Sequence, residues 1–213
     1  MSNITLHRAD TRGHAQHQWL DAFHTFSFAD YYDPTRMQFG ALRVLNNDTI
    51  APGKGFGTHP HDNMEIITIP LSGSLEHRDS MGNTSVIHAG EVQVMSAGTG
   101  VAHSEYNASQ TEPIELLQIW VRTKTRGVTP RYDEHSYLPL SPDSLTQVVS
   151  PDPEDAGTWI HQDAWFHLGT LSSGKGLTYN LKKPGNGVYI FVIEGDIKIQ
   201  DTLLRRRDGI GIV

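Results

Sequence analysis

The chain has 213 residues, 37% of them hydrophobic, which is enough for one large or two small domains with a buried core. It contains no cysteine, which excludes disulfides, thiolate zinc sites, iron–sulfur clusters and blue-copper centres, so any metal must be bound by histidine and carboxylate side chains. The formal net charge of −7 argues against direct binding to nucleic acid.

The sequence predicts neither secretion nor a membrane span. The first residues, MSNITLHRADTRGHAQ, lack the apolar region of a secretory signal, and no run of apolar residues is long enough to span a membrane. We therefore expect a cytoplasmic protein without membrane association. The basic run Arg205–Arg207 follows a strand-like segment and is interpreted as a solvated strand edge.

Short strand-like runs separated by glycine and asparagine turn signals make up most of the chain, and helical periodicity is weak throughout. In chain order the runs are Ala41–Leu45, Glu65–Leu71, Ser85–Ile87, Glu91–Met95, Leu116–Arg122 and Gly187–Ile193. Strands at such spacing predict an all-β fold of the sandwich or jelly-roll type.

The pattern loosens between Thr123 and Ser150, where RTKTRGVTPRYDEHSYLPLSPDS holds three of the 11 prolines. We therefore predict an N-terminal domain (1–125), a linker (126–144) and a C-terminal domain (145–213). The second domain is expected to carry the strands TWIHQDAWFHLGTL and GVYIFVIEGDIKI. The layout of the latter echoes IITIPLSGSLEH of the first domain, which suggests an internal duplication.

Two short segments of the first domain carry candidate metal ligands at matching spacing. GTHPHDNME contains His59 and His61, and AGTGVAHSEYN contains His103 and Glu105. Residues i and i+2 of a strand share a face, so two such strands side by side would direct four ligands at one ion. Because Pro60 cannot donate to a ladder, we expect His59 at the start of its strand.

Three imidazoles and one carboxylate suit a divalent transition metal, with Fe(II) favoured and Mn, Ni, Cu, Co or Zn as alternatives. Two further positions of an octahedral ion would be open to substrate and dioxygen. A metal ion with open coordination positions is typical of a catalytic site.

Five further residues are candidates for the surroundings of the ion. Glu65 follows His61 by four residues, about 13 Å along a strand, so we expect it to line the pocket or to orient a ligand histidine rather than to bind the metal. An apolar pocket wall is expected from Phe56, Met64, Met95 and Trp120, although such side chains also fill ordinary cores.

The remaining histidines do not share this paired pattern. Isolated histidines are weak evidence for a site, so we expect ordinary hydrogen-bonded residues at His77, His88, His135 and His167. Packing roles are expected for His14, His17 and His24.

The two segments resemble the motifs of the cupin superfamily. Gly53 lies six residues before His59, three residues separate the His-Pro-His from Glu65, and three separate His103 from Asn107. Departures from the usual cupin pattern are similar to those of the pirin branch, with Ser96 in place of a common proline and a longer gap between Gly98 and the histidine that follows it.

The resemblance to pirins covers nearly the whole chain, from RGHAQHQWLDAFHTFSFADYYDP to IHQD, and is specific in the first domain but loose after Asp163. It implies two antiparallel jelly-roll barrels in tandem, a bicupin. It further implies that only the first barrel binds a metal, through positions 59, 61, 103 and 105.

The resemblance also implies two alternative functions. One is a quercetin 2,3-dioxygenase, which opens the central ring of a flavonol with O2 and releases CO, with Glu105 as the catalytic general base. The other is a non-enzymatic, iron-dependent regulatory module that acts through a protein partner.

The end of the chain departs from the family pattern. The sequence stops at RRRDGIGIV, where pirins continue with further strands, so we expect a shortened C-terminal barrel. An unclosed barrel has an edge that can pair with another chain, which predicts a homodimer.

Overall fold

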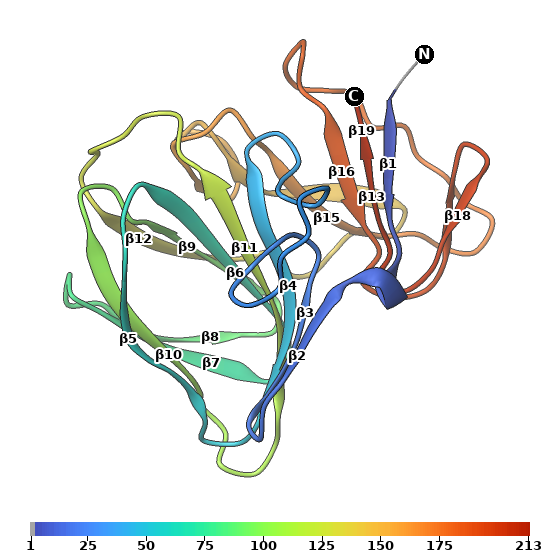
Figure 1. Ribbon diagram of the computed structural model, residues 1–213. Coiled ribbons are helices and arrows are strands. Elements are labelled where there is room, and N and C mark those ends of the chain that lie inside the picture. Colours follow the sequence, from blue (N-terminus) through green and yellow to red (C-terminus); the bar gives the residue numbers. More distant parts are fainter. Residues whose placement is uncertain (1–2) are drawn as a thin grey trace.

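The computed structural model describes residues 3–213, and nearly all its regular structure is β-strand (Figure 1). A short 3-10 helix, η1, spans Ala9–Thr11. The strands are β1 (Ile4–His7), β2 (Gly13–Gln16), β3 (Leu20–His24), β4 (Leu42–Ile50), β5 (Gly55–His61), β6 (Met64–Ser72), β7 (Ser74–Asp79), β8 (Thr84–His88), β9 (Glu91–Ser96), β10 (Val101–Asn107), β11 (Ile114–Arg122), β12 (Arg131–Ser136), β13 (Ser144–Ser150), β14 (Thr158–Trp159), β15 (Phe166–Thr170), β16 (Val188–Phe191), β17 (Ile197–Ile199), β18 (Thr202–Leu204) and β19 (Gly209–Ile212).

Two antiparallel sheets form the first barrel, as the jelly-roll prediction requires (Figure 1). The larger has the order β12-β9-β6-β11-β4-β3-β2, and the smaller the order β5-β10-β7-β8. Successive residues of a strand face opposite sides of its sheet. On β6, Met64 and Ile66 therefore face the barrel interior, whereas Glu65 and Ile67 face outward.

The predicted strand-like runs all fall on strands, namely β4, β6, β8, β9, β11 and β16. The stretch 126–144 differs from a simple connection, because β12 within it pairs with β9 at the edge of the larger sheet. Its sequence, RYDEHS, is largely polar, which an edge strand can accommodate. The segment therefore has no apolar run by which the sequence analysis could recognise a strand.

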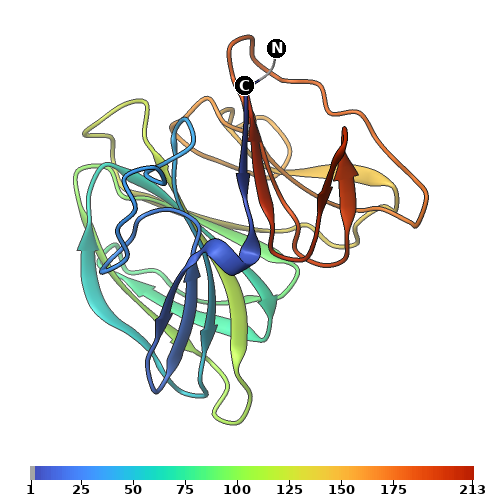
Figure 2. The same cartoon turned by 45° about the vertical axis from the view of Figure 1, so that its right-hand side comes forward.

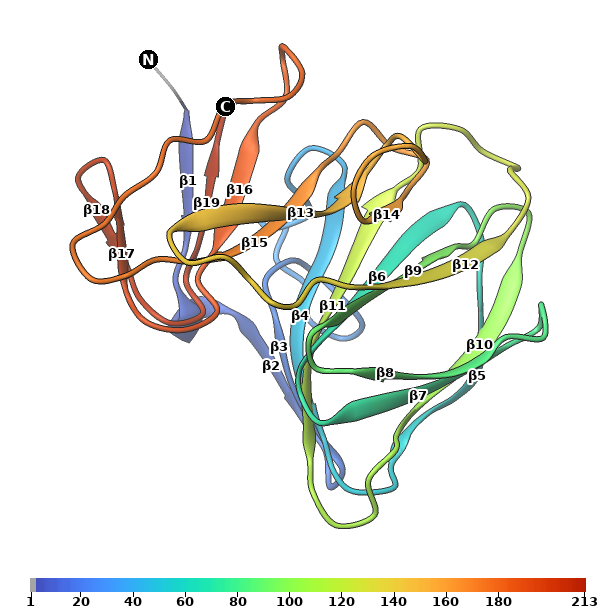
Figure 3. The same cartoon turned by 180° about the vertical axis from the view of Figure 1, so that it is seen from behind.

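The C-terminal part packs against the outer face of the larger sheet (Figure 3). Its strands form the sheets β14-β13-β15, β1-β19-β16 and β17-β18. TWIHQDAWFHLGTL, predicted as one strand, is divided into β14 and β15, and GVYIFVIEGDIKI into β16 and β17. One core is shared between the two parts of the chain, including Ile67, Ile119, Val149 and Ile160.

The last strand of the chain is not an open edge. β19 pairs on one side with β16 and on the other with β1, from Ile4 opposite Ile212 to His7 opposite Gly209. The two ends of the chain lie close together (Figure 2). The last strand is therefore covered on both sides by its neighbours, and the edges of its sheet are β1 and β16. Dimerisation through an edge of the C-terminal part stays a prediction.

Among the helical residues of the described range 3–213, none forms a segment with the length and hydropathy needed to cross a bilayer.

Candidate metal centre

Strands β5 and β10 run side by side and bring three histidines together. His59 lies directly opposite His103, and His61 lies opposite Val101. The ring centroids are 4.4 Å apart for His59 and His103, and 4.9 Å apart for both pairs that include His61. One nitrogen from each ring lies within 4.8 Å of the others, so small side-chain movements would bring all three to about 2.0–2.2 Å from a single ion.

A β-bulge in β5 determines which side of the sheet these side chains face. Phe56 pairs with Glu105 and His59 with His103, so three steps on β5 match two on β10. The carbonyl of Gly57, within the bulge, accepts a hydrogen bond from His59 Nδ1 at 2.8 Å.

The expectation that His59 begins its strand is wrong, because β5 starts at Gly55. Pro60 instead lies near the end of β5, which is an edge strand whose outer side needs no donors.

The chemistry of the three rings fits a metal ion. Burial, followed by the charge of His59, lowers the pKa of His61 from 6.5 to about 4. Burial, followed by His59 and His61, lowers the pKa of His103 to about 2, so both rings are neutral and carry a free lone pair at neutral pH. In the part of the chain that the structure describes, His103 Nε2 is buried without a hydrogen-bond partner. This nitrogen is therefore suited to bind a cation.

Glu105 lies next to this group but is held from the opposite wall of the barrel. Gln118 Nε2 donates to both of its carboxylate oxygens, at 3.2 and 3.0 Å, and Thr68 Oγ1 donates to Oε1 at 3.4 Å. The carboxylate of Glu105 forms a cluster with His77 and His103, separate from the cluster of His59, His61 and His103. Burial raises the pKa of Glu105, whereas the charge of His77 and the hydrogen bond from Gln118 act in the opposite direction.

Gln118 and Thr68 belong to a polar row that crosses the interior face of the larger sheet. The register aligns one side chain from each of six adjacent strands, in the order His24, Asn46, Gln118, Thr68, Gln93 and Glu134. The next row on that face is mainly apolar, namely Val44, Trp120, Ile66, Met95 and Tyr132. The sequence analysis missed the polar row because its members come from separate strands, and only the register aligns them.

The predicted surroundings of the ion are partly assembled. Trp120 meets the ring of His61 edge-on with centroids 4.9 Å apart, and Phe56 lies 6.5 Å from the ring of His59. Met64 and Met95 pack with Trp120 in one apolar cluster. The pocket role of these four apolar residues stays a prediction.

Glu65 does not orient a ligand histidine. It faces away from the barrel interior, and its Oε2 accepts a hydrogen bond from Ser96 Oγ at 2.6 Å. Among the hydrogen bonds of residues 3–213, none joins its carboxylate to a histidine. The predicted contact is wrong because Met64 and Ile66, one step along β6, take the interior positions.

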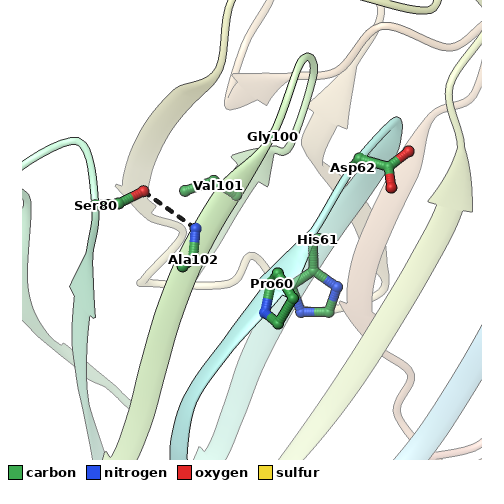
Figure 4. A pocket seen from close by; sticks show the side chains of 7 residues that line it. All are labelled: Pro60, His61, Asp62, Ser80, Gly100, Val101 and Ala102. Carbon is green, nitrogen blue, oxygen red and sulfur yellow. Dashed lines mark hydrogen bonds between the residues drawn. The ribbon is translucent and has the colours of Figure 1, made fainter.

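A cavity of about 360 Å³ opens beside His61 (Figure 4). It lies where β5 ends and β10 begins, and its lining residues are Pro60, His61, Asp62, Ser80, Gly100, Val101 and Ala102. Its size falls in the range of small-molecule sites. The cavity gives a candidate approach to His61 from outside the barrel.

Comparison with known proteins identifies relatives along the whole chain. The family model described as "Pirin" matches residues 6–121, and that described as "Quercetinase C-terminal cupin domain" matches residues 147–213. These ranges are compatible with the predicted domain division, whose boundaries stay predictions.

A quercetin 2,3-dioxygenase from Escherichia coli (strain K12) is 46% identical over 209 residues, which cover 98% of this chain and 89% of that protein. A pirin-like protein from Caulobacter vibrioides is 42% identical over 206 residues, covering 95% of this chain and 88% of the relative. The crystal structure of the bacterial pirin YhhW from Escherichia coli in complex with nickel(II) superposes with a TM-score of 0.93 at 44% identity, covering 98% of this chain and 89% of that one.

Proposed function

Because this chain belongs to the pirin family, we propose that it is a metal-dependent dioxygenase of the quercetin 2,3-dioxygenase type, which opens the central ring of a flavonol with O2 and releases CO. The observation that carries this proposal is the group of three imidazoles beside a buried carboxylate and an accessible cavity. Simple structural histidines would not require such an arrangement.

The proposed ligands are His59, His61 and His103, with Glu105 as the fourth, and the ion is a divalent transition metal. When bound, the metal supplies a Lewis acid that makes the flavonol 3-hydroxyl acidic. The imidazoles contribute neutral nitrogen donors, because burial keeps protons off the rings of His61 and His103. Fe(II) remains the expected ion, and the nickel(II) in the YhhW crystal structure shows what that relative binds.

Glu105 is the proposed general base, which takes the proton of the 3-hydroxyl on a carboxylate oxygen. Burial favours its protonated form and so makes the carboxylate a stronger base than an exposed glutamate. Gln118 and Thr68 offset this effect by donating hydrogen bonds that favour the charged form. The net result of burial and of these contacts is a raised pKa, so the ionised carboxylate is a stronger base than an exposed glutamate.

Apolar side chains are proposed to hold the flat substrate and to exclude water. Trp120 covers one side of His61, and Met64 packs against it in the same cluster. The cavity lined by His61 provides the entrance. Exclusion of water protects the deprotonated substrate and strengthens each polar contact around it.

Oxygen uptake on flavonols tests the proposal. Protein purified without added metal is first analysed for its elements, then loaded with the ion found and mixed with quercetin. We expect consumption of O2, bleaching of quercetin and release of CO, all absent from His61→Ala and retained by His88→Ala, a histidine exposed outside the site. Metal-loaded protein that leaves quercetin and O2 unchanged, but binds a protein partner, would instead support the regulatory function.

A further inference from the structure

A chain of three side chains leads from the β7–β8 turn to the metal centre. Asp79 and His77 lie on the inner face of β7, where Asp79 is opposite His103 and His77 is opposite Glu105. Both side chains are completely enclosed. His77 Nε2 lies 3.1 Å from Asp79 Oδ2, and His77 Nδ1 lies 3.5 Å from His103 Nδ1.

The turn fixes Asp79 as a hydrogen-bond acceptor. Its Oδ1 accepts from the backbone N–H groups of Met81 and Asn83 at 2.9 and 3.0 Å, and its Oδ2 accepts from Asn83 Nδ2 at 2.9 Å. Burial raises the pKa of Asp79, but the hydrogen bonds from Asn83 and His77 lower it overall. An ionised carboxylate can only accept, so His77 must donate its Nε2 proton to Asp79.

The direction of this first bond decides the second. With its one ring proton on Nε2, His77 presents the lone pair of Nδ1 to His103. The facing Nδ1 of His103 must then be the donor. The other nitrogen of His103, Nε2, keeps its lone pair and is the atom found buried without a partner within the described residues.

We propose that Asp79 and His77 are positioning residues that fix His103 in the tautomer protonated on Nδ1, so that its Nε2 is free to bind the cation. Carboxylate–histidine contacts of this kind orient metal ligands and raise their basicity. The carbonyl of Gly57 does the same for His59, since it accepts from His59 Nδ1 and leaves Nε2 free. This inference rests on the proposed metal centre but not on the proposed reaction.

Asp79→Asn gives a test with a defined direction. The amide oxygen can replace Oδ1 as the acceptor from the two backbone N–H groups of the turn, which places the NH2 group where Oδ2 faced His77 and Asn83. The Asn83 amide can then turn to present its oxygen to this NH2 group. His77 Nε2 must then accept, its Nδ1 becomes the donor, and the proton of His103 moves to Nε2. The substitution is therefore expected to reverse the whole chain and to block the ligand nitrogen.

The tautomer is measured directly by long-range 1H–15N NMR of the histidine rings in metal-free protein, with His103→Gln to assign the signals. We expect a single Nδ1–H form of His103 in the wild type, the Nε2–H form in Asp79→Asn, and a mixture in His77→Phe. Nickel(II) titration should show an affinity lower by about 10- to 100-fold in both variants. His88→Phe, whose histidine contacts Ser74 on the exposed side of the same hairpin, is the matched control and should match the wild type in both measurements.

Unchanged tautomer and nickel affinity in Asp79→Asn would overturn the proposal, as would direct coordination of nickel by His77. Should His77→Phe fail to fold, His77→Gln, which keeps a polar side chain, replaces it beside Asp79→Asn. A wild type that shows the Nδ1–H form but has no turnover on flavonols would refute the proposed reaction and leave this inference intact.

Discussion

Gln118 donates its side-chain amide to both carboxylate oxygens of Glu105, at 3.2 Å to Oε1 and 3.0 Å to Oε2. The two residues come from β11 and β10, on opposite walls of the barrel. Gln118 belongs to the polar row, so the Glu105 carboxylate faces the hydrogen-bond donors of that row, Gln118 and Thr68, rather than the adjacent apolar row. These donors offset part of the desolvation that raises the pKa of Glu105.

Loss of the amide should destabilise the metal-free protein. Gln118→Leu leaves a buried carboxylate without its main donor, and we expect the free energy of unfolding to fall by about 1–3 kcal/mol. A double-mutant cycle with Glu105→Met, measured by urea unfolding, isolates the pair. Effects that simply add would show that the two side chains are not coupled in solution.

Substitution of the proposed ligands should separate metal binding from turnover. His61→Ala removes an imidazole of the group, so both metal content and turnover should be lost. Glu105→Gln retains an oxygen ligand but not the base, so kcat should fall by about 10²- to 10⁴-fold while most of the metal is retained. His135→Ala, at an exposed position of β12, is the control. A fully active Glu105→Gln variant would refute the role of Glu105 as the base.

Trp120 should affect substrate binding more than chemistry. Trp120→Leu removes the ring that covers His61, and we expect KM for quercetin to rise about tenfold with metal content unchanged. Steady-state kinetics and elemental analysis check both parts. Trp159→Leu is the matched control, since Trp159 lies under Arg131 in the C-terminal part. An unchanged KM would remove Trp120 from the proposed pocket.

The buried carboxyl of Asp48 should make stability depend on pH. Burial, followed by the charge of Glu105, raises its pKa from 3.8 to about 7. The folded state therefore holds this proton more tightly than the unfolded state, so the free energy of unfolding falls as pH rises from 3.8 towards 7 and stays lowered above that. The loss is at most on the order of 4 kcal/mol.

Asp48→Asn removes the ionisation and keeps the shape. Its free energy of unfolding should match the wild type near pH 4 and exceed it above pH 7, as measured by denaturant titration across this range. Asp201→Asn, at a fully exposed carboxylate, is the control and should show no such difference. A stability difference that is the same at every pH would contradict the raised pKa of Asp48.

Local sequence patterns were sufficient to predict the all-β fold class and the strand-like runs. They also pointed to His59, His61 and His103, because residues two apart in a strand lie on the same face of its sheet. Contacts that depend on register were not predictable in this way. Gln118 is one of many polar residues until the sheet aligns it with Thr68, and His77 looks isolated until β7 pairs with β10. The pairing of β1 with β19 joins the two ends of the chain, which no local window spans.

X-ray absorption spectroscopy of the metal-loaded protein, together with anomalous diffraction at the metal edge, tests the central claim most directly. We predict one ion bound by His59, His61, His103 and Glu105, with ligand distances of about 2.0–2.2 Å. Binding the ion would then draw the Glu105 carboxylate towards the three imidazoles. An ion held by His77, His103 and Glu105 without His59 and His61, or a site without any carboxylate ligand, would contradict it.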